Sequence, residues 1–296
     1  MSDRILDFSD EPVRLCCRNG LLVIQREAQD DLTVPFAEIA VVVVSHPQIS
    51  LTHAVLSGLA AAGGVFITCN EARLPAGMFL PLDTHFTQAE RFALQAQASL
   101  PTRKRLWQQI IRAKLRAQSS LLMDLRGEDG DIALLAIHVR SGDPDNVEAL
   151  AARHYWPLLF KDPNFTRNRT ADDQNRLLNY GYAVLRAIVA RAVCAAGLHP
   201  SLGLHHHNRY DAFCLADDLM EPFRPIVDAA VVRWTDAHGP QAPLDRDAKA
   251  ALLAALGERI KLDGESRTLF DVVSRLAQSL AAVFASQRED LILPEL

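Results

Sequence analysis

Short apolar runs dominate the first part of the chain and predict strands. Residues 13–17 and 21–25 flank Asn19-Gly20, the pair that most strongly favours a two-residue hairpin turn. Residues 40–44 and 65–68 are rich in β-branched side chains and predict further strands. Between residues 50 and 62 apolar side chains recur at helical spacing, and Gly63-Gly64 ends that helix. The pattern indicates a small sheet domain that carries at least one helix.

The apolar spacing changes to a helical period beyond Leu74-Pro75-Ala76-Gly77, whose proline and glycine are typical of a linker. We place the domain boundary near residue 80. Helical runs follow at residues 86–99, 103–124, 131–140, 144–160, 171–197 and 211–234, with a C-terminal pair at 245–257 and 266–287. The expected fold class is α+β, with a small β-rich N-terminal domain (residues 1–80) followed by a larger α-helical C-terminal domain (residues 81–296).

The composition of the 296 residues is that of a globular protein, with 49% hydrophobic and 23% charged side chains. The first residues are charged and lack the apolar core of a secretory signal. The longest apolar helix candidate, residues 182–197, is interrupted by Arg186 and Arg191 and is too short to cross a bilayer. The 5 cysteines show no C-x-x-C spacing, which argues against a disulfide framework and a thiolate zinc site. We expect a cytoplasmic protein with no membrane segment.

The distribution of charge matters more than its sum. A formal net charge of -5 argues against a nucleic-acid ligand, because phosphates are bound by basic surfaces. Between residues 91 and 123, however, the chain has basic residues and no acidic ones: Arg91, Arg103, Lys104, Arg105, Arg112, Lys114 and Arg116. This run is either a local binding face for an anion or an ordinary solvated helix face.

Three segments of the helical part contain residue types that bind metals. In the first, Asp143 is placed to cap a helix that begins at Pro144, and Glu148 follows just past the first turn. Taken alone, such a glutamate is more often an exposed side chain that the helix dipole favours. The second segment is the triple histidine, residues 205–207. Neutral imidazoles bind metal ions well, and a polar loop is the alternative interpretation.

The third segment reads LADDLMEPFRP over residues 215–225. Asp218 and Glu221 lie three residues apart on one helix face, so their carboxylates repel each other unless a cation lies between them. A metal ion meets that need, and Arg224 could neutralise Glu221 instead. Pro222 has no N–H to donate to the carbonyl of Asp218, which predicts a free oxygen and a bend in the helix.

Carboxylates and an imidazole together form a ligand set for Mg²⁺ or Mn²⁺. These residues therefore predict a metal-dependent site for phosphoryl transfer. Their chemistry alone does not separate a nuclease from a hydrolase that acts on a small phosphate ester.

The segment around Glu221, together with His205-His206 and Val227-Asp228, resembles the signature of the CRISPR-associated integrase, an endonuclease of spacer acquisition. The motif LADDLMEPFRP is similar to the corresponding motif in the type II branch of this family, whose members accompany single-protein, RNA-guided effector nucleases. Glu148 and the neighbouring Ala151-Ala152 agree as well. Chain length and the order of a β-rich and an α-helical domain also agree, so the resemblance covers essentially the whole chain.

The resemblance implies a site. The family's metal ligands fall on Glu148, His206 and Glu221, which would be the catalytic residues here, with Mg²⁺ or Mn²⁺ as the cofactor. A shift of one residue in the alignment would exchange His206 for one of its two histidine neighbours. Asp218 matches an acidic position of the family that supports the ligands from behind.

The resemblance also implies a reaction and partners. The 3′-hydroxyl of a short DNA duplex, the prespacer, is joined to the CRISPR repeat by transesterification. The N-terminal domain is expected to form a homodimer, which assembles with a small ferredoxin-like partner on double-stranded DNA. The RNA-guided effector nuclease is a further candidate partner. We infer that the basic run from Arg103 to Arg116 contacts DNA phosphates. The alternatives are a metal-dependent hydrolase of a small phosphate ester and a DNA-binding scaffold without catalysis.

Overall fold

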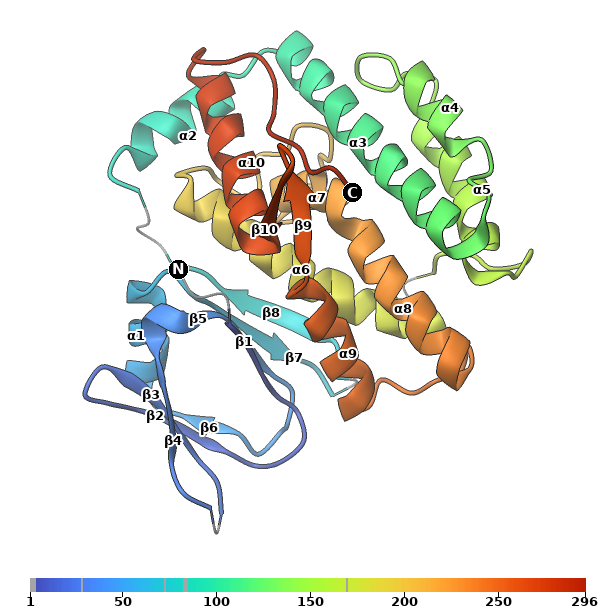
Figure 1. The fold of residues 1–296 in the computed structure, drawn as a ribbon. Coiled ribbons are helices and arrows are strands. Elements are labelled where there is room, and N and C mark those ends of the chain that lie inside the picture. Colours follow the sequence, from blue (N-terminus) through green and yellow to red (C-terminus); the bar gives the residue numbers. More distant parts are fainter. Residues whose placement is uncertain (1–3, 28, 72, 82–84, 169) are drawn as a thin grey trace. The chain divides into compact units, whose positions relative to one another are not determined.

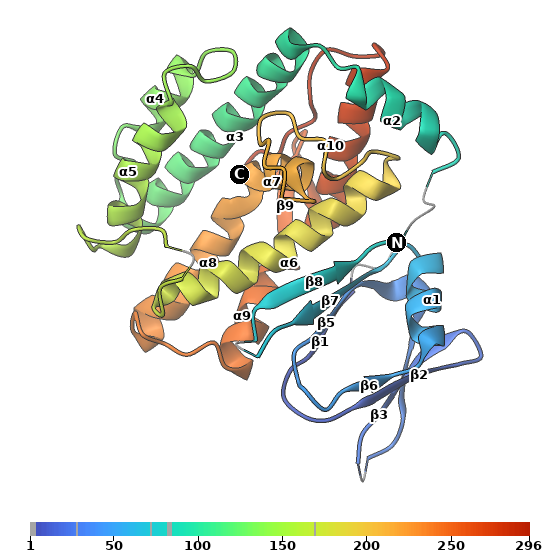
Figure 2. The same cartoon turned by 180° about the vertical axis from the view of Figure 1, so that it is seen from behind.

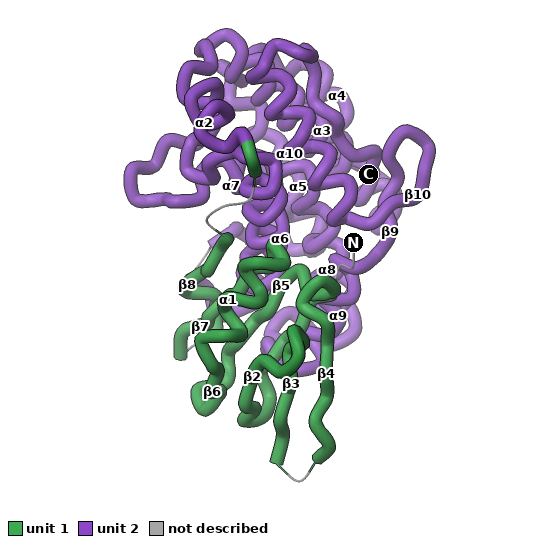
Figure 3. The backbone as a smooth tube through the Cα atoms, turned by 90° about the vertical axis from the view of Figure 1, so that its left-hand side faces the viewer, with its two compact units in different colours: residues 1–86 green, residues 87–296 purple. Residues whose placement is uncertain are grey.

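The computed structural model describes residues 4–296 except 28, 72, 82–84 and 169. The chain forms two compact units, Met1–Phe86 and Thr87–Leu296 (Figures 1 and 3). The sequence pattern placed the boundary near residue 80, whereas the division falls after Phe86. Strands prevail in the first unit and helices in the second, so the expected α+β fold class is confirmed.

Within the described residues, the first unit contains two four-stranded sheets. One has the order β1-β5-β7-β8, with strands Arg4–Phe8, Ile39–Val44, Val65–Cys69 and Pro75–Phe79. Its first three strands are parallel, and β8 is antiparallel to β7. The other has the order β4-β3-β2-β6, with strands Leu32–Pro35, Leu21–Gln25, Arg14–Arg18 and Ser50–Leu51. The 3-10 helix η1 (Phe36–Glu38) and the helix α1 (His53–Ala61) also belong to this unit.

Local sequence explains the strands of this unit. The continuous apolar run of β5 is typical of a central strand that is covered on both faces. Asn19 and Gly20 have φ values of 53° and 75°, as a type I′ turn requires, and they close the predicted β2–β3 hairpin. The segment 74–77 is not a linker, because Pro75 begins β8. This strand lies at the edge of its sheet, where proline is tolerated.

Helices form most of the second unit (Figures 1 and 2). They are α2 (Gln88–Ala96), α3 (Leu100–Arg126), α4 (Ile132–His138), α5 (Val147–Phe160), α6 (Gln174–Ala195), α7 (Cys214–Met220), α8 (Arg224–His238), α9 (Arg246–Leu256) and α10 (Leu269–Phe284). Each lies within or close to a segment in which apolar periodicity predicted a helix.

The helix expected over residues 211–234 is interrupted. It consists of α7 and α8, joined by the 3-10 turn η2 (Glu221–Phe223), in which Pro222 occupies the first turn. The sequence predicted a free carbonyl oxygen at Asp218. This prediction is wrong, because the oxygen accepts the N–H of Glu221. The tighter turn therefore replaces the hydrogen bond that Pro222 cannot make.

The helix expected from residue 266 begins only at Leu269, because a hairpin precedes it. Strands β9 (Arg259–Leu262) and β10 (Glu265–Thr268) pair antiparallel across Asp263-Gly264. Both turn residues have positive φ, 52° and 74°. Asp-Gly is a strong hairpin signal, and it was left unassigned between the two predicted C-terminal helices.

Helix α6 lies in the core of the second unit. Most of its 22 residues are buried, and α7, α8, α9 and α10 pack against it. Residues 182–197 were predicted to be too short to cross a bilayer. The helix in the structure is longer, and among the described residues α6 is the one helix long and apolar enough to cross a membrane. In this structure 72% of its most apolar stretch is buried inside the protein, as in the core helix of a globular unit.

Candidate active site

Helix α3 supports the candidate site. The hydroxyl of Ser99 accepts the N–H of Thr102 at its start, and Gly127, with φ of 78°, ends it. The helix packs against α5, α7 and η2, which carry or adjoin the residues expected to be catalytic. Residues far apart in sequence are therefore brought together along one side of α3.

Glu148 lies in the first turn of α5. Asp143 accepts the N–H groups of Val147 and Glu148 at 2.9 and 3.0 Å, although Asn146, and not Asp143 as expected, is the N-cap residue. The helix begins at Val147, however, and not at Pro144. The Glu148 side chain is 26% exposed and is directed to the ammonium group of Lys114.

Glu221 is nearly completely buried at the start of η2. Its Oε1 accepts the Nε–H of Arg224 at 2.9 Å, so Arg224 neutralises this carboxylate, as the sequence had suggested as an alternative to a metal. Its Oε2 lies 2.6 Å from Nζ of Lys114 but makes no aligned hydrogen bond. Burial by itself would raise the pKa of Glu221, but the charges of Arg224 and Lys114 lower it to about 2. The carboxylate is therefore ionised.

Lys114 connects the two glutamates. Its Nζ donates to Oε1 of Glu148 at 2.5 Å and lies 2.6 Å from Oε2 of Glu221. Burial would lower the pKa of Lys114, but the two carboxylates raise it, so the ammonium stays charged. Lys114 of the basic run thus has its charge paired within the protein. Arg112 is engaged as well, since its guanidinium donates to the carbonyl of Val139 at 2.8 Å.

Asp218 organises the loop that carries the histidines. It is completely buried, and its Oδ2 accepts the N–H groups of Leu204 and His205 at 2.6 and 3.1 Å. Its Oδ1 lies 2.6 Å from Nδ1 of His206. A glycine is needed at Gly203, because a Cβ there would lie 2.5 Å from the carbonyl oxygen of His206. The hydrogen bond to Asp218 raises the pKa of His206 and fixes its ring through Nδ1, which leaves Nε2 available as a ligand.

The three adjacent histidines have different surroundings. His205 stacks on the buried Trp107 with ring centroids 4.3 Å apart, and burial lowers its pKa. His206 is bonded to Asp218. His207 is exposed, as its two neighbours are, and lines a pocket together with His206. Of the three histidines, His206 is the one whose ring is seen to contact a carboxylate in the described part of the chain.

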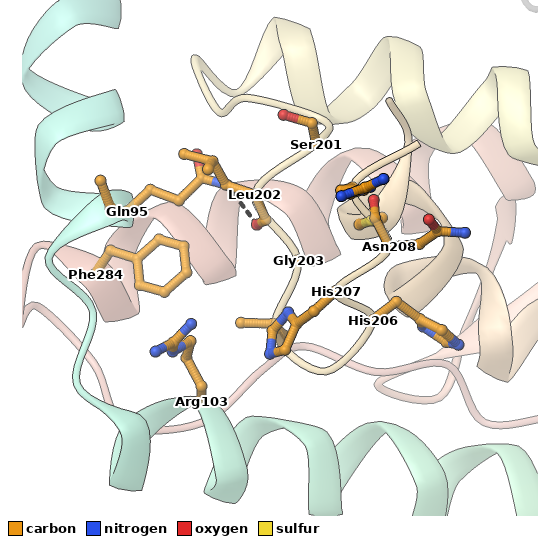
Figure 4. A pocket seen from close by; sticks show the side chains of 13 residues that line it. Gln95, Arg103, Ser201, Leu202, Gly203, His206, His207, Asn208 and Phe284 are labelled. Atoms are coloured by element: carbon orange, nitrogen blue, oxygen red, sulfur yellow. Dashed lines mark hydrogen bonds between the residues drawn. The ribbon is translucent and has the colours of Figure 1, made fainter. Parts of the chain in front are cut away.

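A pocket of about 280 Å³ adjoins His206 (Figure 4). Arg103 from α3 and His207 from the loop face this opening, and Arg209 and Phe284 also line it. Gln95 fixes the loop on the other side, because its amide donates to the carbonyls of His199 and Leu202 at 3.0 and 2.9 Å. Two guanidinium groups and an imidazole make the pocket suitable for an anion.

A further buried carboxylate, Asp228, lies behind the site. Asp228 accepts the hydroxyl of Tyr155 at 2.7 Å and also that of Tyr182. Burial raises the pKa of Asp228 to about 6, although both hydroxyls act in the opposite direction. The guanidinium of Arg224 lies over the ring of Tyr182, 4.5 Å from its centroid. This network holds Arg224 in place beside Glu221.

The structure thus brings Glu148 and Glu221 to a single cation. His206 is near enough for its charge to lower the pKa of Glu221. In the part of the chain that is described, no group of three His, Cys, Asp or Glu side chains is spaced to hold a metal ion. The donor types nevertheless fit a hard divalent cation, because Oε2 of Glu221 is buried without a hydrogen bond and the imidazole has a free nitrogen.

Sequence reasoning missed the position of Lys114 and the role of Asp228. A signal existed for both. Lys114 follows Ile110 by four residues and Ile111 by three, so it lies on the buried face of α3. Asp228 directly follows the buried Val227 and precedes the buried Val231 by three residues. A charged residue on an otherwise apolar helix face indicates a buried partner.

The fold and the site define a class: a two-part α+β protein whose helical part holds a cluster of carboxylates, a histidine and a lysine. The family model described as "CRISPR associated protein Cas1" matches residues 8–252. The chain is 36% identical over 287 residues to the CRISPR-associated endonuclease Cas1 of Neisseria meningitidis serogroup C (strain 8013), covering 96% of this chain and 93% of that protein. This chain therefore belongs to the Cas1 family, which confirms the resemblance stated from its sequence.

Solved structures share this fold at low sequence identity. A casposase bound to integration product superposes with a TM-score of 0.79 at 19% identity, covering 98% of this chain and 92% of that chain. A chain of a Cas6-RT-Cas1–Cas2 complex gives a TM-score of 0.77 at 16% identity, covering 100% of this chain and 36% of that chain. The match to the fold extends over both units.

Proposed function

We propose that this protein is a metal-dependent DNA endonuclease and integrase of CRISPR adaptation. The observation that carries the proposal is the convergence of Glu148 and Glu221, from separate elements, on one cation beside His206. The endonuclease name of the Neisseria relative and the fold shared with a casposase bound to integration product support a reaction on DNA.

The cofactor would be Mg²⁺ or Mn²⁺, held by Glu148, Glu221 and Nε2 of His206. When bound, the ion supplies a Lewis acid that favours the ionised hydroxyl nucleophile and offsets charge on the phosphoryl oxygens. Asp218 orients the imidazole through Nδ1. Arg224 keeps Glu221 ionised, so this carboxylate does not have to lose a proton before it binds a cation.

The reaction would be a transesterification. The 3′-hydroxyl oxygen of the prespacer attacks a phosphorus atom of the CRISPR repeat, a new P–O bond forms, and the P–O bond to the leaving 3′-oxygen breaks. The proton of the attacking hydroxyl goes to solvent, and the leaving oxygen takes up a proton. One phosphodiester replaces another, so the step needs no oxidant and no nucleotide cofactor.

The DNA strand would reach the site along the pocket beside His206. Arg103 and Arg209 line this pocket and have the charge that phosphates require. We assign the backbone contacts to these residues in preference to Lys114 and Arg112, whose charges are engaged within the protein. Within the basic run, the proposed contact with DNA phosphates is therefore assigned to Arg103.

The proposed assembly is a cytoplasmic homodimer, formed through the first unit, that binds double-stranded DNA together with a small ferredoxin-like partner. One structural neighbour is a chain of a Cas6-RT-Cas1–Cas2 complex, which supports a second protein in the assembly. The RNA-guided effector nuclease is a further partner to be tested by co-purification.

The test combines the purified protein with Mn²⁺, the partner, a prespacer duplex and a plasmid that carries the repeat. We expect joined DNA from the wild type and background levels from Glu221→Gln, which keeps the size of the side chain. Glu128→Gln, at an exposed position of the same unit, is the matched control. A prespacer that lacks its 3′-hydroxyl should give no product. Equal joining by wild type and Glu221→Gln would show that the site is wrong.

Salt dependence separates the alternatives. Duplex binding that weakens steeply with salt is expected for an enzyme that contacts phosphates, whereas an absence of duplex binding would favour a hydrolase of a small phosphate ester. A DNA-binding scaffold would bind the duplex in wild-type and Glu221→Gln forms alike, and neither form would yield joined product.

A further inference from the structure

We infer that Lys114 is an internal competitor of the divalent ion: its ammonium and the metal bind Glu148 and Glu221 in turn. This inference rests on the proposed function, because it needs a metal at these carboxylates. Nζ of Lys114 lies 2.5 Å from Oε1 of Glu148 and 2.6 Å from Oε2 of Glu221. Carboxylate oxygens lie about 2.0–2.1 Å from Mg²⁺. A divalent ion held by the same two carboxylates would therefore compete with this nitrogen for its place.

Charge balance disfavours the presence of both occupants at once. The carboxylates of Glu148 and Glu221 are matched by the cations of Lys114 and Arg224. A divalent ion added to this set would leave two uncompensated positive charges in a partly buried site, where charge repulsion is weakly screened. Withdrawal of one resident cation would reduce this excess to a single positive charge and would therefore favour binding of the ion.

Lys114 is the cation that can withdraw. Arg224 is fixed by its hydrogen bond to Glu221 and by its stacking over Tyr182. Lys114 has a flexible aliphatic stem, and its other partner, Glu148, is 26% exposed against 5% for Glu221. The ammonium can thus leave on the Glu148 side, toward solvent.

The same contacts give Lys114 a role in the metal-free protein. Without it, Glu221 would be paired with Arg224 alone and Glu148 would approach a second carboxylate without an intervening cation. Lys114 therefore holds the two ligands close together before the metal arrives. The cost of this arrangement is a weaker apparent affinity for the metal, because binding must displace the ammonium.

The direct test is Mn²⁺ affinity, measured on the full-length protein by electron paramagnetic resonance of the free ion and by calorimetry. We expect Lys114→Met to bind Mn²⁺ more tightly than the wild type, by about tenfold or more, since a competing charge is gone. Lys104→Met is the matched control: it is the same substitution on the same helix, and the Lys104 stem packs below Gly142, away from the carboxylates. Its Mn²⁺ affinity should equal that of the wild type.

A second variant changes the affinity in the opposite direction. Lys114→Arg places a planar, bidentate cation between the carboxylates, which should be harder to displace. Its Mn²⁺ affinity should be below that of the wild type. If Lys114→Met binds Mn²⁺ no more tightly than the wild type, or Lys114→Arg binds it no more weakly, the inference is overturned.

A measurement on the wild type needs no variant to fold. A limiting dose of acetic anhydride followed by mass spectrometry should label Lys114 slowly without metal and faster with Mg²⁺, while the labelling of Lys104 stays constant. Unchanged labelling of Lys114 would contradict displacement.

Glu221→Gln separates the two levels of the proposal. If Mn²⁺ binding depends on Glu221 but not on the residue at position 114, the competition is refuted and the metal site stands. If Glu221→Gln binds Mn²⁺ as the wild type does, the metal site itself is refuted, and the competition with it.

Discussion

Replacing Asp218 with asparagine should detach the histidine loop from α7. Asparagine keeps one oxygen, which can accept either from His206 or from the two backbone N–H groups of Leu204 and His205, but not from both sides. If the oxygen remains at His206, the amide nitrogen faces two N–H donors. Two charge-assisted hydrogen bonds are then lost at a side chain that is completely buried.

The magnitude follows from those two bonds. A hydrogen bond to a charged group contributes about 1.5–3 kcal/mol, so two of them give about 3–6 kcal/mol. The loop can move and expose its N–H groups to water, which places the expected loss at the lower end, about 3 kcal/mol. Disorder of the ring of His206 should also weaken Mn²⁺ binding by about 10–100-fold, as is usual when the partner that orients a metal-binding histidine is removed.

Urea unfolding followed by circular dichroism measures the first effect, and calorimetry with Mn²⁺ measures the second. Asp124→Asn, an exposed aspartate on α3, is the control and should change neither quantity. A stability loss below about 1 kcal/mol together with wild-type Mn²⁺ affinity would refute the reasoning that Asp218 holds the loop.

Three further outcomes are expected. The fold raises the pKa of Asp228 from 3.8 to about 6, so its contribution to stability is full below about pH 4 and is lost as pH rises through 6. Relative to Asp228→Asn, the wild type should lose up to about 3 kcal/mol of unfolding free energy between these limits, measured by urea unfolding at each pH; parallel pH profiles would contradict this. Arg103→Gln should weaken duplex binding and reduce the slope of log affinity against log salt by about one, and an unchanged slope would remove Arg103 from the DNA contacts. Alanine substitution at His206 should abolish Mn²⁺ binding, whereas the same change at His205 or His207 should not; loss at His205 instead would move the ligand by one position.

The helices and most of the strands of this protein could be predicted because their apolar periodicity is local. The failures lie where tertiary position decides the structure. Pro75 and Gly77 read as a linker, yet β8 pairs with β7 at a sheet edge, where its proline does no harm. Asp263-Gly264 lay between two predicted helices and was not recognised as a turn, yet the two residues have positive φ values and close a hairpin.

The family resemblance named the residues of the candidate site. The charges that surround these residues could not be predicted from the sequence. Sequence spacing placed Asp218 and Glu221 on one helix face. In the structure they have separate partners, since Asp218 holds the histidine loop and Glu221 pairs with Arg224 and Lys114. Lys114 is separated from Glu221 in sequence by much of the second unit, so no local pattern joins them.

The packing of α6 has a consequence for synthesis of the chain. The helices that pack most extensively against α6 all follow it in sequence, from α7 to α10. A ribosome therefore exposes an apolar segment that is long enough for a membrane before it has made the cover for that segment. During that interval the apolar face of α6 has no cover, which exposes the nascent chain to aggregation.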